Sequence, residues 1–366
     1  MSLDANKIDK MPWFLVSAVA LACVLLALKF LHLLPEPNAA LIALEVFLLG
    51  TAVFSAVHHA EVLALNVGEP MGSIVLALAV TIIEAALIIS QMSSGKHGAE
   101  FIGRDTVFSG VLIVLNGIVG MCLLVGGARH HEQEFRLDGA TSALSVLATL
   151  ACLALILPNY TLAAPGPFYS ASQLAFVGIV SLILYGVFVF VQTVRHRDYF
   201  ITTADSSDAS EVVPKSQTVL LSAILLPISL VVVVLVAKAL SGPIDNAIVA
   251  AGLPTSFVGV VIALVVLLPE GMAALRAAGH NQLQTSLNLA LGSAIATIGL
   301  TIPTLAAYSI WAGEKLALGL SPQSTALLVL TIFVGSVTLA TGRTTILQGA
   351  VHLVIFGVFI FLAAVP

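Results

Sequence analysis

The chain has 366 residues, of which 59% are hydrophobic and only 9% are charged, and its mean hydropathy is +1.09. Soluble domains carry about 25% charged residues, so this composition excludes a soluble globular protein and indicates a polytopic protein whose solvent is lipid. The net charge of -5 is small for this length, and the 14 Lys and Arg residues are scattered, so we expect no nucleic-acid partner.

Eleven apolar segments are long enough to cross a bilayer as helices, each of which needs about 20 residues. They lie at approximately 12–34, 39–58, 70–92, 106–127, 139–158, 170–194, 217–240, 252–278, 284–310, 321–340 and 344–365. Breakers such as Pro35, Pro37 and Gly242-Pro243 separate them. We therefore predict an all-α polytopic membrane protein with about eleven transmembrane helices. The first segment follows Lys7 and Lys10 as a signal peptide would, but its apolar run is too long, and we expect a retained helix.

The distribution of basic residues predicts the orientation of the chain, because Lys and Arg are enriched in cytoplasmic loops. If the N-terminus is cytoplasmic, nine Lys and Arg residues lie on that side and five on the other. The nine are Lys7, Lys10, Arg129, Arg136, Arg195, Arg197, Lys215, Arg276 and Arg343, and the five are Lys29, Lys96, Arg104, Lys238 and Lys315. We therefore predict a cytoplasmic N-terminus, a C-terminus on the opposite side, and a cytoplasmic acidic linker at 195–216, which contains Asp198, Asp205, Asp208 and Glu211.

One apolar stretch occurs twice, first as Val75–Glu84 and again as Val261–Glu270. The identical pairs are Val75/Val261, Ala77/Ala263, Leu78/Leu264, Val80/Val266 and Glu84/Glu270. The copies lie in the third and eighth predicted spans, so they cross the membrane in opposite directions. Inverted repeats of this kind are typical of secondary transporters, whose site lies at the repeat interface. We predict repeats at 36–194 (spans 2–6) and 217–366 (spans 7–11), with 1–35 as an additional peripheral helix.

Each copy ends in a single carboxylate, Glu84 or Glu270, with no basic residue in its own run. A charge in hydrocarbon costs at least a few kcal/mol, so we predict that the two glutamates meet near the midplane and bind a cation; a structural ion pair is the alternative. Thr81 lies one turn before Glu84 and can support it. Pro269 frees a backbone carbonyl, and Gly271 permits bending. Such oxygens suit Ca2+, and the carboxylates can take up protons instead, which indicates proton-coupled antiport.

Other polar residues in the spans are weaker candidates. Ser293 and Thr297 in the ninth span and Asn116 in the fourth can line the site, although helix packing alone explains each of them equally well. We expect Ser293 to be a cation ligand. Glu45, in the second span, has no counterpart in the other repeat, so structural and gating roles are equally open.

The cluster His58-His59-Ala60-Glu61 ends the second predicted span on the cytoplasmic side. Adjacent histidines point apart on a helix, which argues against a transition-metal site. We expect a solvated interfacial cluster, and a pH-sensing gate formed by His58 and Glu61 is the sharper alternative.

Six segments spread over nearly the whole chain share features with a known family. They are His58–Ala64, Gly68–Glu84, Arg104–Thr106, Leu268–Gly271, Asn281–Ser293 and Gly342–Thr344. Together they resemble the cation/Ca2+ exchanger (CAX) family, and most closely the bacterial ChaA-type calcium/sodium:proton antiporters. This resemblance implies eleven helices, inverted repeats and exchange of Ca2+ for H+ across the bacterial inner membrane, which would place the C-terminus in the periplasm. It also implies that the two repeat glutamates act as cation ligands and proton acceptors.

The chain departs from the family at several ligand positions. The Asn positions of the family's GNAxE motifs hold Thr81 and Leu267, and the glutamine expected three residues after Ser293 is Ala296. Fewer side-chain oxygens favour a broader cation range that includes Na+ or K+ beside Ca2+.

The sequence contains no P-loop, HExxH or GxSxG motif, which argues against a primary pump or an intramembrane protease. We predict that the chain is not an enzyme, needs no cofactor, and exports Ca2+, with Na+ or K+ as further substrates, against entering protons. Its expected partners are membrane lipid and the transported ions, and states from monomer to trimer are open. A cation channel that uses the same glutamates without obligatory proton exchange is the alternative, and a membrane-embedded enzyme is a more distant one.

Overall fold

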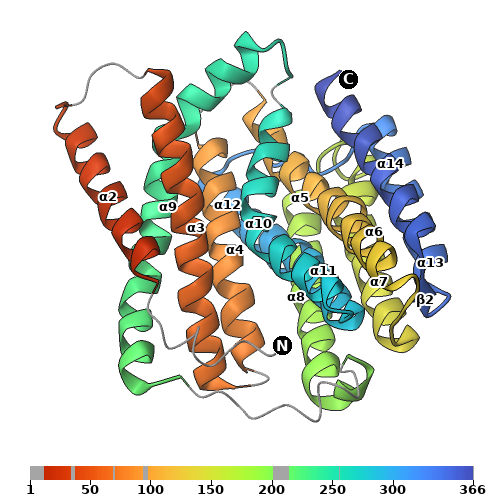
Figure 1. Cartoon of the computed structure of the whole chain (residues 1–366). Helices are drawn as coiled ribbons and strands as arrows, with labels where there is room; N and C mark the ends of the chain where they lie inside the picture. Colours follow the sequence, from red (N-terminus) through yellow and green to blue (C-terminus); the bar gives the residue numbers. More distant parts are fainter. Residues whose placement is uncertain are drawn as a thin grey trace.

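The computed structural model describes residues 12–33, 38–68, 71–93, 98–200, 214–254 and 256–365. Within these ranges, eleven helical segments are long and apolar enough to span a membrane, which confirms the predicted all-α polytopic class. They pack side by side in one bundle (Figure 1). Several predicted features lie outside the described residues. They are the breakers Pro35 and Pro37, the basic residues Lys7, Lys10 and Lys96, and most of the predicted acidic linker.

Several spans are made of more than one helical segment, with short 3-10 or π-helical parts (labelled η) between or beside α-helices. In chain order the elements are α2 (Trp13–Phe30), α3 (Ala39–Val67), α4 (Met71–Met92), η1 (Ala99–Phe101), α5 (Ile102–Leu112), η2 (Ile113–Ile118), α6 (Val119–His130), β1 (Gln133–Glu134), α7 (Leu137–Ala151), η3 (Cys152–Ile156), η4 (Leu157–Tyr160), α8 (Ala171–Phe190), η5 (Val191–Arg195), η6 (Arg197–Tyr199), α9 (Ser216–Ala250), α10 (Phe257–Gly279), α11 (Leu283–Ala296), η7 (Thr297–Thr301), α12 (Ile302–Ala312), α13 (Pro322–Leu339), β2 (Arg343–Thr344) and α14 (Ile346–Ala364).

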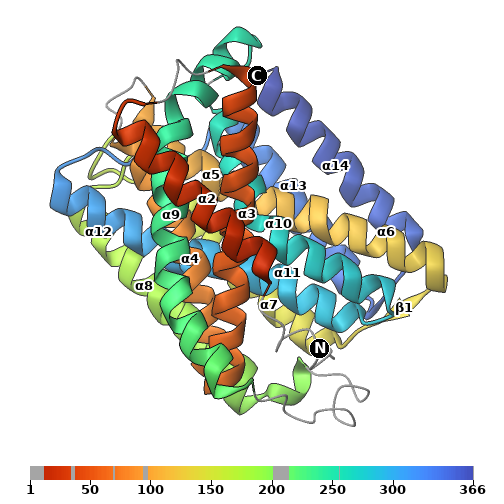
Figure 2. The same cartoon turned by 60° about the vertical axis from the view of Figure 1, so that its left-hand side comes forward.

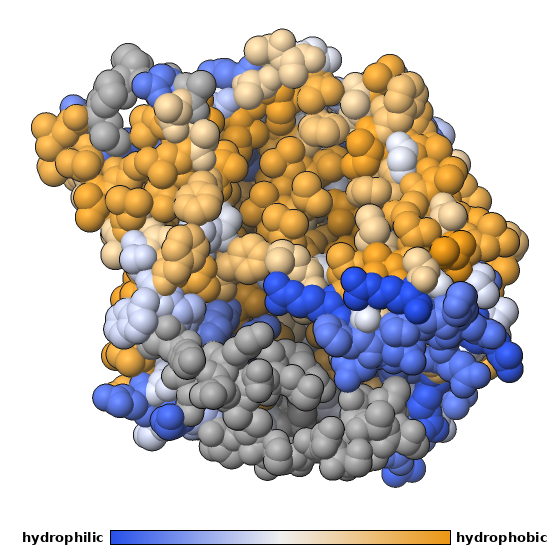
Figure 3. All heavy atoms as spheres, in the orientation of Figure 1, coloured by the Kyte–Doolittle hydropathy of each residue, from blue (hydrophilic) through white to orange (hydrophobic). Residues whose placement is uncertain are grey.

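The outer surface of the bundle is apolar. Large hydrophobic side chains are exposed on many helices, for example Phe30 and Trp311 at 85% and Phe176 at 67%. Figure 3 shows apolar residues over most of the upper part of one face and hydrophilic residues gathered below them. Soluble monomers rarely expose apolar patches of this extent, so the surface agrees with a bundle solvated by lipid.

Among the described residues, the helices pack around two large hydrophobic cores that meet at α4 and α10, and a small third cluster holds Cys122, Ala274 and Ala278. The smaller core joins α2, α3 and α9, and α4 contributes Ile83 while α10 contributes Val266. The larger core joins most of the remaining helices, and there α4 contributes Ile88 while α10 contributes Ala263 and Leu267. The two helices that carry the repeated stretch therefore lie at the boundary between the cores.

Two helices continue past their predicted ends. α3 runs to Val67 instead of 58 because the intervening residues favour a helix, and it ends at Gly68, whose φ of 76° is accessible to glycine. α9 runs through the predicted breaker Gly242-Pro243. Pro243 has no N–H for the carbonyl four residues earlier, but the Lys29 Nζ atom lies 3.4 Å from that oxygen, on Ala239, and donates to it instead.

Two π-helical segments interrupt the spans that follow the glutamates. η2 lies between α5 and α6, and η7 lies between α11 and α12. A π-helix widens the turn and is frequent at functional sites. Both segments are largely buried and adjoin the helices that carry the repeated stretch.

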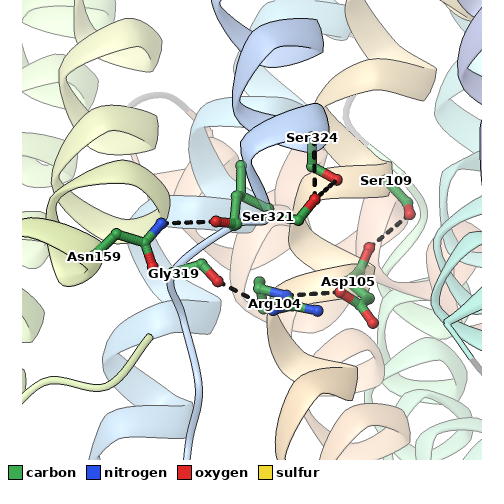
Figure 4. A network of polar contacts seen from close by, with 8 residues as sticks. Arg104, Asp105, Ser109, Asn159, Gly319, Ser321 and Ser324 are labelled. Atoms are coloured by element: carbon green, nitrogen blue, oxygen red, sulfur yellow. Dashed lines mark hydrogen bonds and ion pairs between the residues drawn. The ribbon is translucent and has the colours of Figure 1, made fainter. Parts of the chain in front are cut away.

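Polar contacts hold the ends of the bundle. Arg104 donates through Nε to Asp105 at 2.7 Å and through Nη1 to the carbonyl of Gly319 at 3.0 Å, and Asn159 donates to the carbonyl of Leu320 at 2.7 Å (Figure 4). These bonds fix the connection between α12 and α13 against α5 and η4. At the other end of the bundle, β1 pairs with β2 in antiparallel register.

Candidate functional site

Glu84 lies on α4 with 3% of its surface exposed. Its Oε2 atom accepts a hydrogen bond from the Thr301 hydroxyl at 2.9 Å, and the Thr297 hydroxyl is a second polar contact. Thr81 is buried one turn before it. No ion pair to Glu84 occurs in the described parts of the chain. A carboxylate supported by hydroxyl groups and free of a basic partner can bind either a cation or a proton.

Glu270 lies on α10, and its Oε2 atom is buried without a hydrogen-bond partner among the described residues. Burying a polar oxygen without a hydrogen bond costs free energy unless a ligand or a proton interacts with it. α10 stays helical through Pro269, so the chain does not unwind there in this conformation. Gly271 lies against η2, since a Cβ atom at this position would lie 3.1 Å from the Cδ1 atom of Ile118.

The structure brings a third carboxylate to the two predicted ones. Glu61, on α3, and Glu84 are both close enough to Glu270 to interact with it electrostatically. The α3–α4 connection and the C-terminal end of α10 lie on the same side of the bundle (Figure 1). At a rise of 1.5 Å per residue, Glu61 lies about 9 Å from this side along α3, Glu270 about 14 Å along α10, and Glu84 about 20 Å along α4. The three carboxylates are therefore staggered from one membrane face toward the midplane.

The predicted interfacial location of the His58–Glu61 cluster is wrong. Because α3 continues to Val67, the cluster lies inside the helix and packs against α9. His59 is fully buried, and its Nδ1 atom lies 3.1 Å from the hydroxyl of Ser222. His58 is on the same helical face as Glu61, and its Nε2 atom is buried without a partner in the described residues. Over those residues, no three His, Cys, Asp or Glu side chains converge as a metal centre would require.

Hydroxyl groups form a row along the ninth span. Ser293 is half-buried on α11, Thr297 follows one turn later beside Glu84, and Thr301 follows after another turn. Thr301 donates to Glu84 but was not among the predicted site residues. The spacing of four residues from Ser293 through Thr297 to Thr301 is the sequence signal that would have identified it, because residues four apart share a helical face.

Asn116 is bonded away from the glutamates. Its amide nitrogen donates to the Thr331 hydroxyl at 2.9 Å, and its oxygen lies 3.0 Å from the Nδ1 atom of His352. The other ring nitrogen of His352 lies 3.1 Å from the Thr338 hydroxyl. This buried network attaches η2 to α13 and α14, so its contacts favour a packing role for Asn116.

Glu45 is also separate from the carboxylate cluster. It is 1% exposed and forms an ion pair with Lys29 of α2 at 2.7 Å. This pair joins α2 to α3 and favours the structural alternative over a gating role.

The fold and the site define the class of protein. Ionisable residues inside a membrane mark ion or proton pathways by default. This bundle holds three carboxylates that have no basic partner among the described residues, of which Glu84 is buried and Glu61 and Glu270 are half-buried. The family model described as sodium/calcium exchanger protein matches residues 37–194 and 221–365, and the chain belongs to this family of membrane transport proteins. The predicted resemblance to cation exchangers is confirmed.

Individual relatives cover most of the chain. The "Putative ionic transporter y4hA" of Sinorhizobium fredii is 54% identical over 344 residues, which is 94% of each chain. The sodium-potassium/proton antiporter ChaA of Escherichia coli is 35% identical over 314 residues, or 85% of each chain. The solved structure of YfkE, a Ca2+/H+ antiporter protein, has a TM-score of 0.74 at 18% identity and covers 97% of this chain and 99% of its own. This last similarity shows a shared fold.

Proposed function

We propose that the chain is a secondary cation:proton antiporter of the bacterial inner membrane, in which Glu84 and Glu270 bind the transported cation and the protons in turn. The observation that carries this proposal is a pair of repeat-related carboxylates without basic partners in the described residues: Glu84 is buried and bonded to Thr301, and Glu270 is half-buried with one buried, unpartnered oxygen. The names of ChaA and YfkE support proton-coupled cation exchange over enzymatic activity.

The chemistry follows from the cost of burying charge. Two ionised carboxylates in a low-dielectric interior are unfavourable unless a cation or protons neutralise them. Cations and protons therefore compete for one site. The protein would change between its two open conformations only when a cation or protons occupy that site. The hydroxyls of Thr81, Thr297, Thr301 and Ser293 and the Val265 carbonyl, which Pro269 leaves free, would replace part of the hydration shell of the cation. No resident cofactor takes part.

Glu61 extends the pathway toward one membrane face. Its position on α3 is closer to that face than either repeat glutamate, and it lies within electrostatic range of Glu270. A carboxylate there would attract cations into the site and pass protons to and from it. In the orientation that the basic residues predict, this face is cytoplasmic, so cations would enter from the cytoplasm and leave into the periplasm.

Two structural correspondences support inverted repeats at 36–194 and 217–366. The π-helical segments η2 and η7 occupy equivalent spans, each being the span after the repeat glutamate. The helices α8 and α14 close the two halves, and both begin at a capping box, formed by Ser170 with Gln173 and by Thr345 with Gln348. In this arrangement α2 is an additional peripheral helix.

The ligand set favours a broad range of cations. Ca2+ prefers six to eight oxygen ligands, and hydroxyl groups supply most of the side-chain oxygens beyond the carboxylates here. We propose Ca2+ together with Na+ or K+ as substrates, and the name of ChaA, a sodium-potassium/proton antiporter, supports the monovalent ions.

The test is collapse of an acid-inside pH gradient in everted vesicles on addition of Ca2+, Na+, K+ or Mg2+. Wild type should collapse the gradient, and Glu84→Gln or Glu270→Gln should abolish the collapse. Glu314→Gln, which neutralises an exposed carboxylate elsewhere, is the matched control and should behave as wild type. Normal activity of both glutamine variants would refute the site. Cation flux that persists after the pH gradient is dissipated, without any proton movement, would instead favour the channel alternative.

A further inference from the structure

A groove of about 810 Å3 lies between α2 and α9 on the outer surface of the bundle. Figure 2 shows α2 crossing in front of α9. The wall of the groove is mostly apolar, with Leu26, Val231 and Leu235 among its residues, and two lysines, Lys29 and Lys238, line it as well. Its volume falls within the usual range for small-molecule sites, about 300–1,000 Å3.

The two lysines line the same groove and have unused N–H donors. Lys29 reaches the carbonyl of Ala239, the residue after Lys238, at 3.4 Å. An ammonium group has three N–H donors, and Lys29 uses one on Glu45 and one on Ala239, which leaves one. Lys238 is exposed in the groove. Glu45 offsets one positive charge, so the group keeps a net positive charge that suits an anion.

The dimensions of the groove match one leaflet of a bilayer. Lys238 lies eleven residues after Pro227, which is about 16 Å along α9, and the hydrocarbon half of a bilayer is about 15 Å thick. Lys238 also lies about 33 Å along α9 from Ser216, close to the full hydrocarbon thickness of about 30 Å. The lysines are therefore at the depth of headgroups, and the apolar wall runs from them toward the midplane.

We propose that this groove binds an anionic phospholipid, with its phosphate between Lys29 and Lys238 and an acyl chain against the apolar wall. A single lysine or a smooth apolar surface would not bind a lipid specifically. The groove combines two lysines for the phosphate with an apolar wall for the acyl chain, at matching depths in the membrane. The site is remote from the carboxylate cluster, so this inference does not depend on the proposed transport activity.

The experiment uses the purified full chain, delipidated in a neutral detergent. Thermal unfolding is measured with phosphatidylglycerol, with phosphatidylcholine of the same acyl chains and with inorganic phosphate, and native mass spectrometry counts retained lipids. Phosphatidylglycerol should raise the unfolding temperature of wild type more than phosphatidylcholine does, and inorganic phosphate should have no effect. Lys238→Gln should at least halve this preference, whereas Lys315→Gln, an exposed lysine outside the groove, should keep it.

A second pair of variants tests the apolar wall. Val231→Trp fills the groove and should reduce retention of phosphatidylglycerol, while Val354→Trp, at an exposed position on α14, should not. Equal stabilisation by the two lipids, or full preference in both Lys238→Gln and Val231→Trp, would overturn the proposal. Stabilisation by inorganic phosphate equal to that by phosphatidylglycerol would also overturn it, because it would show that the lysines bind a free anion.

Discussion

Replacing Thr301 with valine removes the donor of a hydrogen bond to Glu84 while keeping the shape of the side chain. The bond is 2.9 Å long, and Glu84 is only 3% exposed, so bulk water has little access to replace the donor. A hydrogen bond to a charged group contributes about 1.5–3 kcal/mol. At about 1.4 kcal/mol per factor of ten, this loss corresponds to roughly 10- to 150-fold in an equilibrium constant.

Cation binding at the proposed site requires ionised Glu84. Thr301→Val should therefore raise the half-saturating cation concentration by about this factor. The remaining hydroxyl of Thr297 makes the upper value a limit. The assay is gradient collapse in everted vesicles, titrated with Ca2+ and with Na+ at fixed pH. Thr301→Ser should retain most of the affinity because it keeps the donor.

Thr304→Val is the matched control, because the Thr304 hydroxyl donates to the Leu300 carbonyl of its own helix at 2.8 Å and not to a carboxylate. It should leave the half-saturating concentration near that of wild type. If Thr301→Val binds cations as tightly as Thr304→Val, the hydroxyl does not support an ionised Glu84, and the reasoning fails.

Two further predictions follow from the buried charges. Lys29→Met leaves Glu45 buried and unpaired, which should lower the free energy of unfolding by about 3–5 kcal/mol. The double variant Lys29→Met/Glu45→Leu should recover much of this loss, as measured by thermal unfolding. A double variant no more stable than Lys29→Met alone would contradict this prediction. Glu61→Gln should raise the half-saturating Ca2+ concentration at alkaline pH, where the carboxylates are ionised, because roughly 1 kcal/mol of attraction, or about fivefold, is lost. Unchanged Ca2+ titrations of Glu61→Gln, measured beside Glu314→Gln in the vesicle assay, would remove Glu61 from the pathway.

The sequence predicted the features that depend on local composition. Lipid solvation forces each span to be apolar over its whole length, so hydropathy alone located all eleven spans. Lone carboxylates are conspicuous in such segments, which is why Glu84 and Glu270 could be singled out, although their role remains a prediction. The offset of five spans between the two copies predicts an inverted repeat from their positions alone, and that repeat also stays a prediction.

The features that the sequence did not predict depend on distant partners. Gly242-Pro243 looked like a helix end because the proline removes an N–H, and the group that satisfies the freed carbonyl belongs to Lys29, on another helix. His59 looked solvated because nothing in its own segment shows that α9 covers it with Ser222. The contact between Thr301 and Glu84 joins residues 217 positions apart, so the sequence could indicate Thr301 only through its spacing from Ser293 and Thr297 and not through its partner.

The position of the glutamates at the boundary of the two cores bears on how a buried charge can be loaded and released. Each core consists of buried apolar side chains, and close-packed interiors resist gradual deformation. In the exchange proposed above, a carboxylate inside one core would stay inaccessible, whereas one on α4 or α10, at the boundary, would gain or lose access if the cores shifted relative to each other. The unpartnered oxygen of Glu270 lies on one of these boundary helices. We infer that Glu270 can exchange its ligand because the burial of this unpartnered oxygen is unfavourable. A carboxylate whose oxygens were all hydrogen-bonded by the protein would gain little from exchanging a cation for a proton.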